Sequence, residues 1–509
     1  MKMEATAHSH QRNIFSRLRL GVWPQRAALA CLGLAALSAG CLVGPDFKPP
    51  QEKVPAKFSA QPADQAGQAL RDQDLAQWWG IFNDPVLLSL EKRALAANLD
   101  LKLAMARLRQ ARASRGIAAG GLGPELDATG SYQRSRSSEN TTKTSTSQAG
   151  QVYNLYQAGF DASWEIDIFG GLRRNLEAAD ADLLSAEQAR RQVMVSLTAE
   201  VARNYLELRT LQQRIVIART NLATQRHTAR LTRQRQEVGF VSGLDTANAE
   251  AQASTTAARI PPLEASARQT IHALGVLLGQ EPAALLPQLT PSEPIPASPP
   301  TVPTGLPSDL LTRRPDIRQA EAKLHAATAR VGVATADLFP RFMLTGSAGY
   351  QSTSFDSWPN WGSRFWSIGP SISWPIFASG RIKANIELKD AQAEEALLLY
   401  RQTVLNSLRE VEDALVASTL EQSHRRELAT AVAANQKALK LSTLLYTEGQ
   451  VEFLNVLQAQ GALYATEDAL VSSNGAVGTN LVALYKALGG GWQAEARTGK
   501  PAAPLASSN

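Results

Sequence analysis

The chain has 509 residues and a net charge of +6, and its length allows two or three domains with a large buried core. Most of the positive charge lies in the first 40 residues, and no run of Lys and Arg follows, which argues against a nucleic-acid partner. No stretch beyond residue 45 holds 18 consecutive apolar residues, so we expect no membrane-spanning helix there.

The N-terminus has the layout of a secretory signal. Residues 1–26 are basic, with Glu4 as their one carboxylate, and residues 27–40 are an apolar run of Ala, Leu and Gly. This run is too short to span a membrane stably. We therefore expect a signal peptide over residues 1–40 that is removed from the mature protein.

Cys41 directly follows this signal. The small residues before it resemble a bacterial lipobox, in which the signal is cut before a cysteine that carries a lipid, although Ser38 stands where Leu is commonest. Because Cys31 leaves with the signal, Cys41 has no disulfide partner in the chain. We expect lipidation at Cys41, and the resemblance to bacterial lipoproteins implies that Leu42 directs the product to the outer membrane. An ordinary signal with an incidental cysteine is the alternative.

The remaining chain contains one unit twice. Residues 98–132 align with 314–348, and "TGS" recurs in both, so two copies of about 200 residues form a duplicated domain. A Pro-rich segment separates the copies. The expected segments are a lipid-anchored tether at 41–75, a first repeat at 76–286, a linker at 287–305, a second repeat at 306–489 and a flexible tail at 490–509.

Each copy is predicted to contain a helix, two strands, a long helix, a turn and a helix. Apolar and polar residues alternate along each predicted strand, as in a half-buried sheet. A soluble sheet on a core is one interpretation, but two of the strands exceed 10 residues and carry aromatic residues near their ends, as outer-membrane strands do. The predicted strands span 126–132, 156–168, 342–350 and 366–376.

The strand count has a consequence for assembly. A sheet that spans a bilayer must close on itself, because lipid cannot satisfy an open edge. The smallest single-chain barrels have about eight strands. Four strands per chain therefore require several chains to share one barrel.

The long helices support an extended molecule. Residues 173–237 and 381–447 contain neither Pro nor Gly, so each helix could reach roughly 100 Å. Coiled-coil spacing occurs in both, and a fibrous stalk is the alternative that the strands argue against. The spaced residues are Val201, Leu208, Leu211 and Ile215 in one helix, and Val404, Leu408, Val411 and Leu415 in the other.

Several segments resemble the TolC family of outer-membrane efflux proteins, in its lipoprotein branch of OprM and NodT types. The matching pieces include "CLVGPDFKPP", "WWGIFNDPVLLSL", "DIFGGLRR", "GLDTANAEAQ" and "RRPDIRQAEAKL", and the resemblance covers nearly the whole mature chain. It implies an α+β membrane protein that forms a homotrimer. Three copies would share a 12-stranded transmembrane β-barrel in the outer membrane and a long α-helical barrel in the periplasm.

The same resemblance implies a passive exit duct for drugs or other small molecules. An inner-membrane pump, of the RND type, would drive efflux through a periplasmic adaptor (membrane fusion protein). A conduit for metal ions or for a secreted polypeptide remains an alternative, as does a structural surface lipoprotein without a pore. The duct would contact outer-membrane lipid and would need no cofactor beyond the lipid on Cys41.

No motif indicates catalysis. "GFVSG" at 239–243 misses the serine elbow by one place, and none of the six His pairs at metal-ligand spacing in the mature chain. We therefore expect neither an enzyme nor a metal site. Asp161, Glu165 and Asp167 lie on the polar side of a predicted strand, where they would be solvated lumen residues; a bias of the pore toward cations is the alternative.

Both long helices stop at a glycine, after which the chain reverses into another helix. These turns lie at the far ends of the helices from the strands, and the resemblance implies that they are periplasmic tips that dock the adaptor. The alternative, compatible with docking, is that they are simply helix turns. The candidate docking residues are Gly239, Val241, Ser242, Asp245, Gly449 and Val451.

The resemblance also places a periplasmic gate just after the second turn. TolC-like ducts can carry two aspartates there, in the pattern V-D-V-L-D-A, whereas this chain has "LNVLQA". A neutral gate would close through amide hydrogen bonds and apolar contacts, and Glu452 is the acidic residue that would matter if this alignment is wrong. The candidate gate residues are Leu454, Asn455, Leu457 and Gln458.

Overall fold

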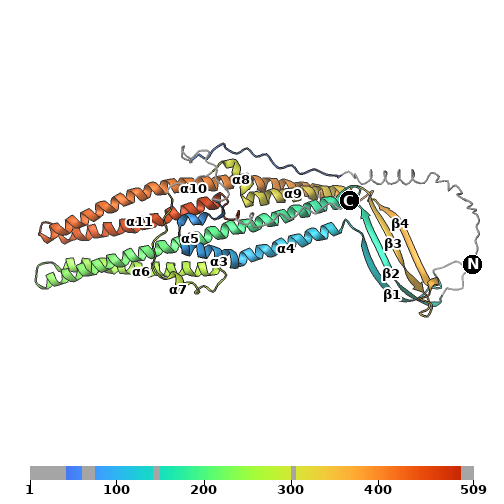
Figure 1. The fold of residues 1–509 in the computed structure, drawn as a ribbon, viewed down its shortest axis with the longest axis horizontal. Helices are drawn as coiled ribbons and strands as arrows, with labels where there is room; N and C mark the ends of the chain where they lie inside the picture. Colours follow the sequence, from blue (N-terminus) through green and yellow to red (C-terminus); the bar gives the residue numbers. More distant parts are fainter. Residues whose placement is uncertain (1–41, 60–74, 141–149, 300–304, 494–509) are drawn as a thin grey trace, which may run out of the picture. The chain divides into compact units, whose positions relative to one another are not determined.

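A computed structural model describes residues 42–59, 75–140, 150–299 and 305–493, and its elements follow the expected duplicated order (Figure 1). In each repeat a helix leads into two strands, a long helix and a returning helix. The order is α4, β1, β2, α5 and α6 in the first repeat and α9, β3, β4, α10 and α11 in the second. The chain divides into a β unit and a helical unit, which are described separately.

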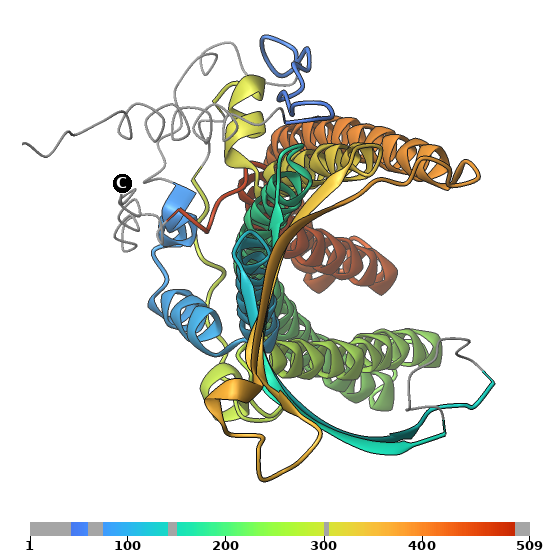
Figure 2. The ribbon, with the colours of Figure 1, turned by 90° about the vertical axis from the view of Figure 1, so that its right-hand side faces the viewer.

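The β unit is a single antiparallel sheet in the order β1-β2-β3-β4. The central pair, β2 and β3, joins the two repeats, with Gly159 opposite Gly349. Figure 2 shows the four strands as one curved layer. The strands are β1 (Glu125–Arg136), β2 (Val152–Ile166), β3 (Arg341–Ser352) and β4 (Arg364–Ser373).

The sheet has one apolar and one polar face, as the alternation predicts. Phe160 on β2 and Trp366 on β4 lie on the apolar face and are 58% and 74% exposed in the single chain. On the other face Asp161 stands opposite Asp127 and accepts a hydrogen bond from Thr129 Oγ1 at 2.9 Å. Among the described residues the outer edges of β1 and β4 have no strand partner.

The observed strands extend beyond most of the predicted ends, but β2 and β4 stop before the predicted end. β2 ends at Ile166, because Asp167 turns away to cap the next helix: its Oδ2 accepts from the Arg173 N–H at 2.9 Å and from Arg173 Nε at 3.3 Å. Asp167 is therefore not a lumen residue of the strand. β4 ends at Ser373, before the Trp374–Pro375 step, since a proline cannot donate to a strand ladder.

The helical unit contains two long hairpins (Figure 1), and all but one of the residues with coiled-coil spacing are buried. Val201, Leu208 and Val411 are fully buried, whereas Leu408 is half-buried. Among the residues that the structure describes, no helix is long and apolar enough to cross a membrane. The helices are α4 (Leu99–Gly120), α5 (Gly171–Glu237), α6 (Gly243–Leu277), α9 (Pro315–Ala336), α10 (Arg381–Thr447) and α11 (Phe453–Ala487).

The main core lies where short helices pack against the long ones. Trp78 stacks on Tyr485 at 5.3 Å, which joins the start of the first repeat to the end of the second. Asp84 caps α3 and accepts a hydrogen bond from Tyr205 Oη at 2.7 Å. Burial, and then this hydrogen bond, raise the pKa of Tyr205. The short elements are η2 (Trp78–Phe82), α3 (Pro85–Ala97), α7 (Leu286–Leu289), α8 (Pro307–Arg313) and η3 (Trp361–Ser363) in the β3–β4 loop.

Candidate functional site

The turn after α5 is closed by backbone hydrogen bonds. Gly239 has φ +78°, a conformation that side chains rarely adopt. Its N–H donates to Gln236 O at 2.9 Å, and the Phe240 N–H donates to Arg235 O at 2.8 Å. This pair of bonds is the Schellman arrangement that satisfies the last carbonyls of a helix. The sequence prediction of a glycine-terminated helix is confirmed here.

Two predicted tip residues meet at the start of α6. The Asp245 N–H donates to Ser242 Oγ at 3.3 Å, and the Ser242 N–H donates back to Asp245 Oδ2 at 3.2 Å. This reciprocal pair is a capping box, which fixes how the chain enters the helix. The Ser242 hydroxyl also donates to Asp245 Oδ2 at 2.9 Å, so in this structure it is engaged as a cap.

The turn after α10 has the same backbone and different side chains. Gly449 has φ +76°, its N–H donates to Tyr446 O at 3.1 Å, and the Gln450 N–H donates to Leu445 O at 2.9 Å. Glu452 occupies the N-cap of α11, but its side chain makes no capping hydrogen bond. Instead Phe453, only 3% exposed, anchors the turn by packing with Val456 and Ala249.

A groove of about 830 Å³ lies between the two turns. Val241 and Val451 both line it, so the structure brings one predicted tip residue from each repeat to the same surface. Arg235 lies over the Tyr446 ring at 5.2 Å. The Tyr446 hydroxyl is buried in the groove and has no hydrogen-bond partner among the described residues.

The predicted gate residues divide between two environments. Leu454, Asn455 and Gln458 are exposed, and Leu454 is 46% exposed. Leu457 is half-buried and packs against the cluster around Phe453. Asn455 Nδ2 donates to Glu452 O at 3.4 Å, within its own turn. The predicted gate residues that are exposed in the first two turns of α11 are therefore one leucine and two neutral amides.

Sequence reasoning missed the apolar surface of the first turn. Phe240 is 81% exposed and Leu244 is 68% exposed, and both lie among the predicted docking residues in the sequence. Large apolar residues next to a helix-ending glycine are the signal that could have identified them, because a tight turn leaves little room to bury them.

Sequence reasoning also missed a row of polar side-chain contacts between α5 and α11. Arg214 forms a bidentate ion pair with Asp468 at 2.8 and 2.9 Å. Further pairs follow toward the turns, at seven-residue intervals on α5. They are Asn221 with Glu467 at 3.2 Å and Thr228 with Gln460 at 3.3 Å. These contacts join the two repeats, so no local pattern reveals them.

The other candidate positions add no site. Cys41 lies outside the described residues. Within the described ranges no group of His, Cys, Asp and Glu residues is arranged to hold a metal ion. His325 instead stacks on Phe47 at 4.3 Å, and its Nε2 lies 2.9 Å from Glu177 Oε1.

Comparisons with known proteins agree with this architecture. The sequence profile of a family described as "Outer membrane efflux protein" matches residues 90–280 and again 306–490. The chain is 34% identical over 470 residues to nodulation protein T of Rhizobium leguminosarum bv. viciae, covering 92% of this chain and 94% of that protein. It is 36% identical over 428 residues to the pyoverdine export outer membrane protein OpmQ of Pseudomonas aeruginosa, covering 83% and 89%.

A solved structure of the outer-membrane channel OprN matches with a TM-score of 0.84 and 37% identity, covering 89% of this chain and all of that one. The long helices, the four strands and the repeat thus follow the TolC-like fold. The chain belongs to the family of outer membrane efflux proteins, which are channels and not enzymes.

Proposed function

We propose that three copies of this chain form the outer-membrane exit duct of a tripartite efflux system. The match of the family to both repeats carries this proposal, because relatives named as efflux-pump outer membrane proteins align over about nine-tenths of the chain. The duct itself is passive. An inner-membrane pump of the RND type supplies the energy through a periplasmic adaptor.

The sheet supports a shared barrel. Its apolar face suits lipid and its polar face suits a water-filled lumen. Within the described chain β1 and β4 have open edges, which lipid does not tolerate. If β4 of one copy pairs with β1 of the next, three copies close a barrel of 12 strands.

The two turns are the proposed adaptor surface. The groove between them has an apolar rim that includes Val241, Phe240 and Val451, and such exposed apolar surface typically marks a protein interface. Val241→Arg should abolish efflux without lowering the yield of trimer. Normal drug resistance in this variant would count against docking at the tips.

The lipid anchor is proposed at Cys41. The segment that follows it is fixed to the start of α5: the Val43 N–H donates to Phe169 O at 3.2 Å, and Arg174 Nε donates to Val43 O at 3.2 Å. Metabolic labelling with palmitate tests the anchor. Labelled Cys41→Ser protein, or unlabelled wild type, would refute it, whereas the trimer should survive this substitution.

Small molecules are the proposed cargo. Similar proteins are named for the export of pyoverdine, toluene and antibiotics. Because these compounds differ, we transfer only the class of small molecules to this chain and no particular compound. The central experiment is conductance of the purified mature protein in planar bilayers. We expect stable steps from a trimer and restored drug efflux in a strain that lacks its own outer-membrane channel. Absence of both activities would overturn the proposal.

A further inference from the structure

Positive charge gathers at one end of the apolar face of the sheet. The strand registers place Arg134 and Arg136 of β1 and Arg364 of β4 on this face, beside the loops that join β1 to β2 and β3 to β4. The helices continue the chain from the other end of the strands. The loop end of the apolar face is therefore basic, because all carboxylates of the four strands lie on the polar face. These carboxylates are Glu125, Asp127, Asp161 and Glu165.

Arg364 is exposed and is held in place by the turn before it. Its Nη1 donates to Trp361 O at 2.8 Å, and its guanidinium lies over the Trp361 ring at 4.3 Å. The turn is fixed within its own loop, since Ser363 Oγ donates to Ser357 O at 2.7 Å. Arg364 makes no ion pair among the described residues. Its remaining N–H groups are therefore available to an anion.

The two arginines of β1 differ in their partners. Arg136 pairs with Glu139 at 3.2 Å, and its Nε donates to Gly150 O at 3.1 Å. The side chains of this ion pair are 65% and 67% exposed, so the pair is weak. Arg134 is exposed and makes no ion pair within the described ranges. The edge strand β1 thus presents one unpaired cation and one weakly paired cation.

The duplication relates β4 to β2 and β1 to β3. Trp164 in β2 donates from Nε1 to Leu122 O at 2.9 Å, and Trp374, directly after β4, donates from Nε1 to Leu338 O at 3.0 Å. The two tryptophans are therefore equivalent, as are the two carbonyls that accept from them. On this alignment the edge strands β4 and β1 correspond to the central strands β2 and β3, whose pairing register is observed.

This correspondence predicts which residues meet where β4 of one copy pairs with β1 of the next. Trp366 corresponds to Tyr156 and Arg136 to Ser352, and Tyr156 is the partner of Ser352 in the β2–β3 ladder. If the contact between copies repeats that ladder, Trp366 stands opposite Arg136 of the next copy. Arg364 is then a diagonal neighbour of that Arg136 on the same face, and diagonal neighbours lie about 7–8 Å apart.

Cations at such positions repel one another, and apolar surroundings strengthen the repulsion because the effective dielectric constant is low. Arg134 of the next copy adds a third cation, two residues from Arg136 on the same face. An anion bound between the three guanidinium groups would remove the repulsion.

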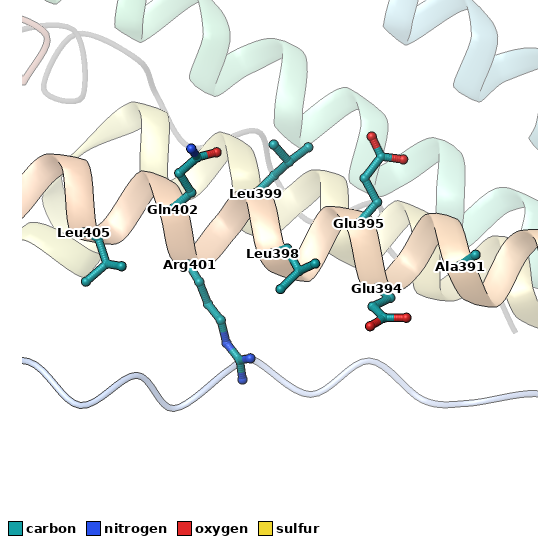
Figure 3. A pocket seen from close by; sticks show the side chains of 8 residues that line it. All are labelled: Ala391, Glu394, Glu395, Leu398, Leu399, Arg401, Gln402 and Leu405. Carbon is teal, nitrogen blue, oxygen red and sulfur yellow. The ribbon is translucent and has the colours of Figure 1, made fainter.

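The groove on α10 has the opposite charge and does not suit an anion. This groove of about 580 Å³ is also partly apolar, but Glu394 and Glu395 line it (Figure 3). Arg401, the one cation among its lining residues, pairs with Glu52 at 2.9 Å. The loop end of the sheet is therefore the better anion site of these two apolar surfaces.

We propose that Arg364 of one copy, with Arg134 and Arg136 of the next, binds a phosphate group of an outer-leaflet lipid. A guanidinium matches the oxygens of phosphate in a bidentate geometry, and the bound anion relieves the repulsion. A lipid suits the site better than free phosphate, because Trp366 and Tyr132 beside the arginines are 74% and 58% exposed and can cover its apolar part. This inference rests on the proposed trimer and assigns a ligand to each contact between its copies.

Native mass spectrometry of the purified mature protein, stripped of bound lipid in a neutral detergent, tests the ligand. The probe is lipopolysaccharide, a phosphate-bearing glycolipid, and the same glycolipid with its phosphates removed is the matched control. We expect up to three bound molecules per trimer, and at least about tenfold weaker binding of the control, because charge-assisted hydrogen bonds are lost. Equal binding of the two probes would overturn the phosphate site. Displacement of the intact probe by an equal concentration of inorganic phosphate would overturn the lipid as the source.

The arginines are tested with Arg134→Gln/Arg364→Gln. This variant should bind the intact glycolipid about tenfold more weakly and should no longer distinguish the two probes. Arg341→Gln is the matched control, because Arg341 lies on the polar face at the helix end of the sheet and pairs with Asp337. It should bind as wild type does. Unchanged binding by the double variant, or an equal loss in the control, would overturn the assignment.

Mild heating of the trimer provides a second readout. Without glycolipid, the double variant should release roughly twofold less monomer than wild type, because the repulsion between copies is reduced. With the intact glycolipid this order should reverse. The same order in both conditions would overturn the meeting of the arginines across copies, while a conducting wild-type trimer would leave the duct standing. A monomeric wild type without conductance would instead overturn the proposed function itself.

Discussion

The two helical turns descend from one duplicated element, and they keep the backbone while differing in how side chains hold it. Both have a glycine at positive φ and the same pair of closing hydrogen bonds. The first turn is fixed by the Ser242–Asp245 capping box and exposes Phe240. The second has no side-chain cap and is fixed by burying Phe453 where the first repeat has Gly243. After the duplication, the backbone geometry of the turn was therefore kept while its surface side chains diverged.

At the other end of the returning helices, the two repeats again use different side chains at equivalent backbone positions. Asn98, before α4, donates from Nδ2 to the Leu277 carbonyl at the end of α6 at 2.9 Å. Arg314, the aligned residue before α9, donates to the Ala487 carbonyl at the end of α11 at 2.7 Å. An amide and a guanidinium thus satisfy equivalent carbonyls, but only the guanidinium also pairs with Asp316 and Glu410.

Because Arg314 makes ion pairs that Asn98 lacks, its substitution should cause the largest loss of stability. Arg314→Ala leaves two carboxylates and a buried carbonyl without their partner, and we expect a loss of about 3 kcal/mol of stability. Asn98→Ala should cost about 1–2 kcal/mol. Thermal melting of the detergent-solubilised protein by circular dichroism measures both. Arg318→Ala, at a partly exposed ion pair, is the control. Equal melting temperatures of the Arg314 and Arg318 variants would contradict the stabilising role of Arg314.

The first repeat also carries a buried acid at a position where the second has Pro307. Glu91 on α3 is fully buried, neither carboxyl oxygen has a hydrogen-bond partner among the described residues, and burial raises its pKa well above the usual value. A raised pKa means that the neutral acid favours the fold. Its contribution is complete below the unfolded pKa of about 4.3 and is lost as pH rises through the folded pKa.

Wild type should therefore lose stability relative to Glu91→Met as pH rises from 5 to 8, by about 2 kcal/mol. Melting curves across this range measure the difference, and subtraction of the variant removes the other titrating groups. Glu237→Gln, at an exposed position, should leave the slope unchanged. A parallel pH dependence of wild type and Glu91→Met would show that Glu91 is not held neutral.

Capping at the tips is a smaller effect. Ser242→Ala should weaken the start of α6 by about 1 kcal/mol, because an N-cap side chain is lost. Amide hydrogen exchange over 243–247 should then accelerate roughly fivefold. Glu452→Ala should leave exchange over 453–457 unchanged, since no cap exists there, and Glu452→Ser should slow it. Equal responses at the two turns would mean that their side chains are equivalent after all.

These cases show which features the sequence alone could predict. Helix breaks at Gly239 and Gly449, strand alternation and the heptads around Val201 and Val411 are local signals, so the elements and the duplication could be read directly. Arg214–Asp468 joins helices from different repeats, and the burial of Glu91 depends on the assembled core. Such contacts are set by tertiary packing, which no spacing within one segment encodes.

The last prediction uses the second turn alone, whose exposed face carries Asn455 and Gln458. In a trimer these amides would form neutral rings, whereas rings of carboxylates would attract cations. Multivalent cobalt complexes added on the periplasmic side should therefore block the wild-type pore weakly. Asn455→Asp/Gln458→Asp should create sensitivity to the blocker. Asn248 in the first repeat is aligned with Gln458. If the second turn alone forms the constriction, Asn248→Asp should not create sensitivity to the blocker. Single-channel current decides: strong block of wild type would shift the constriction to another acidic residue, such as Glu452.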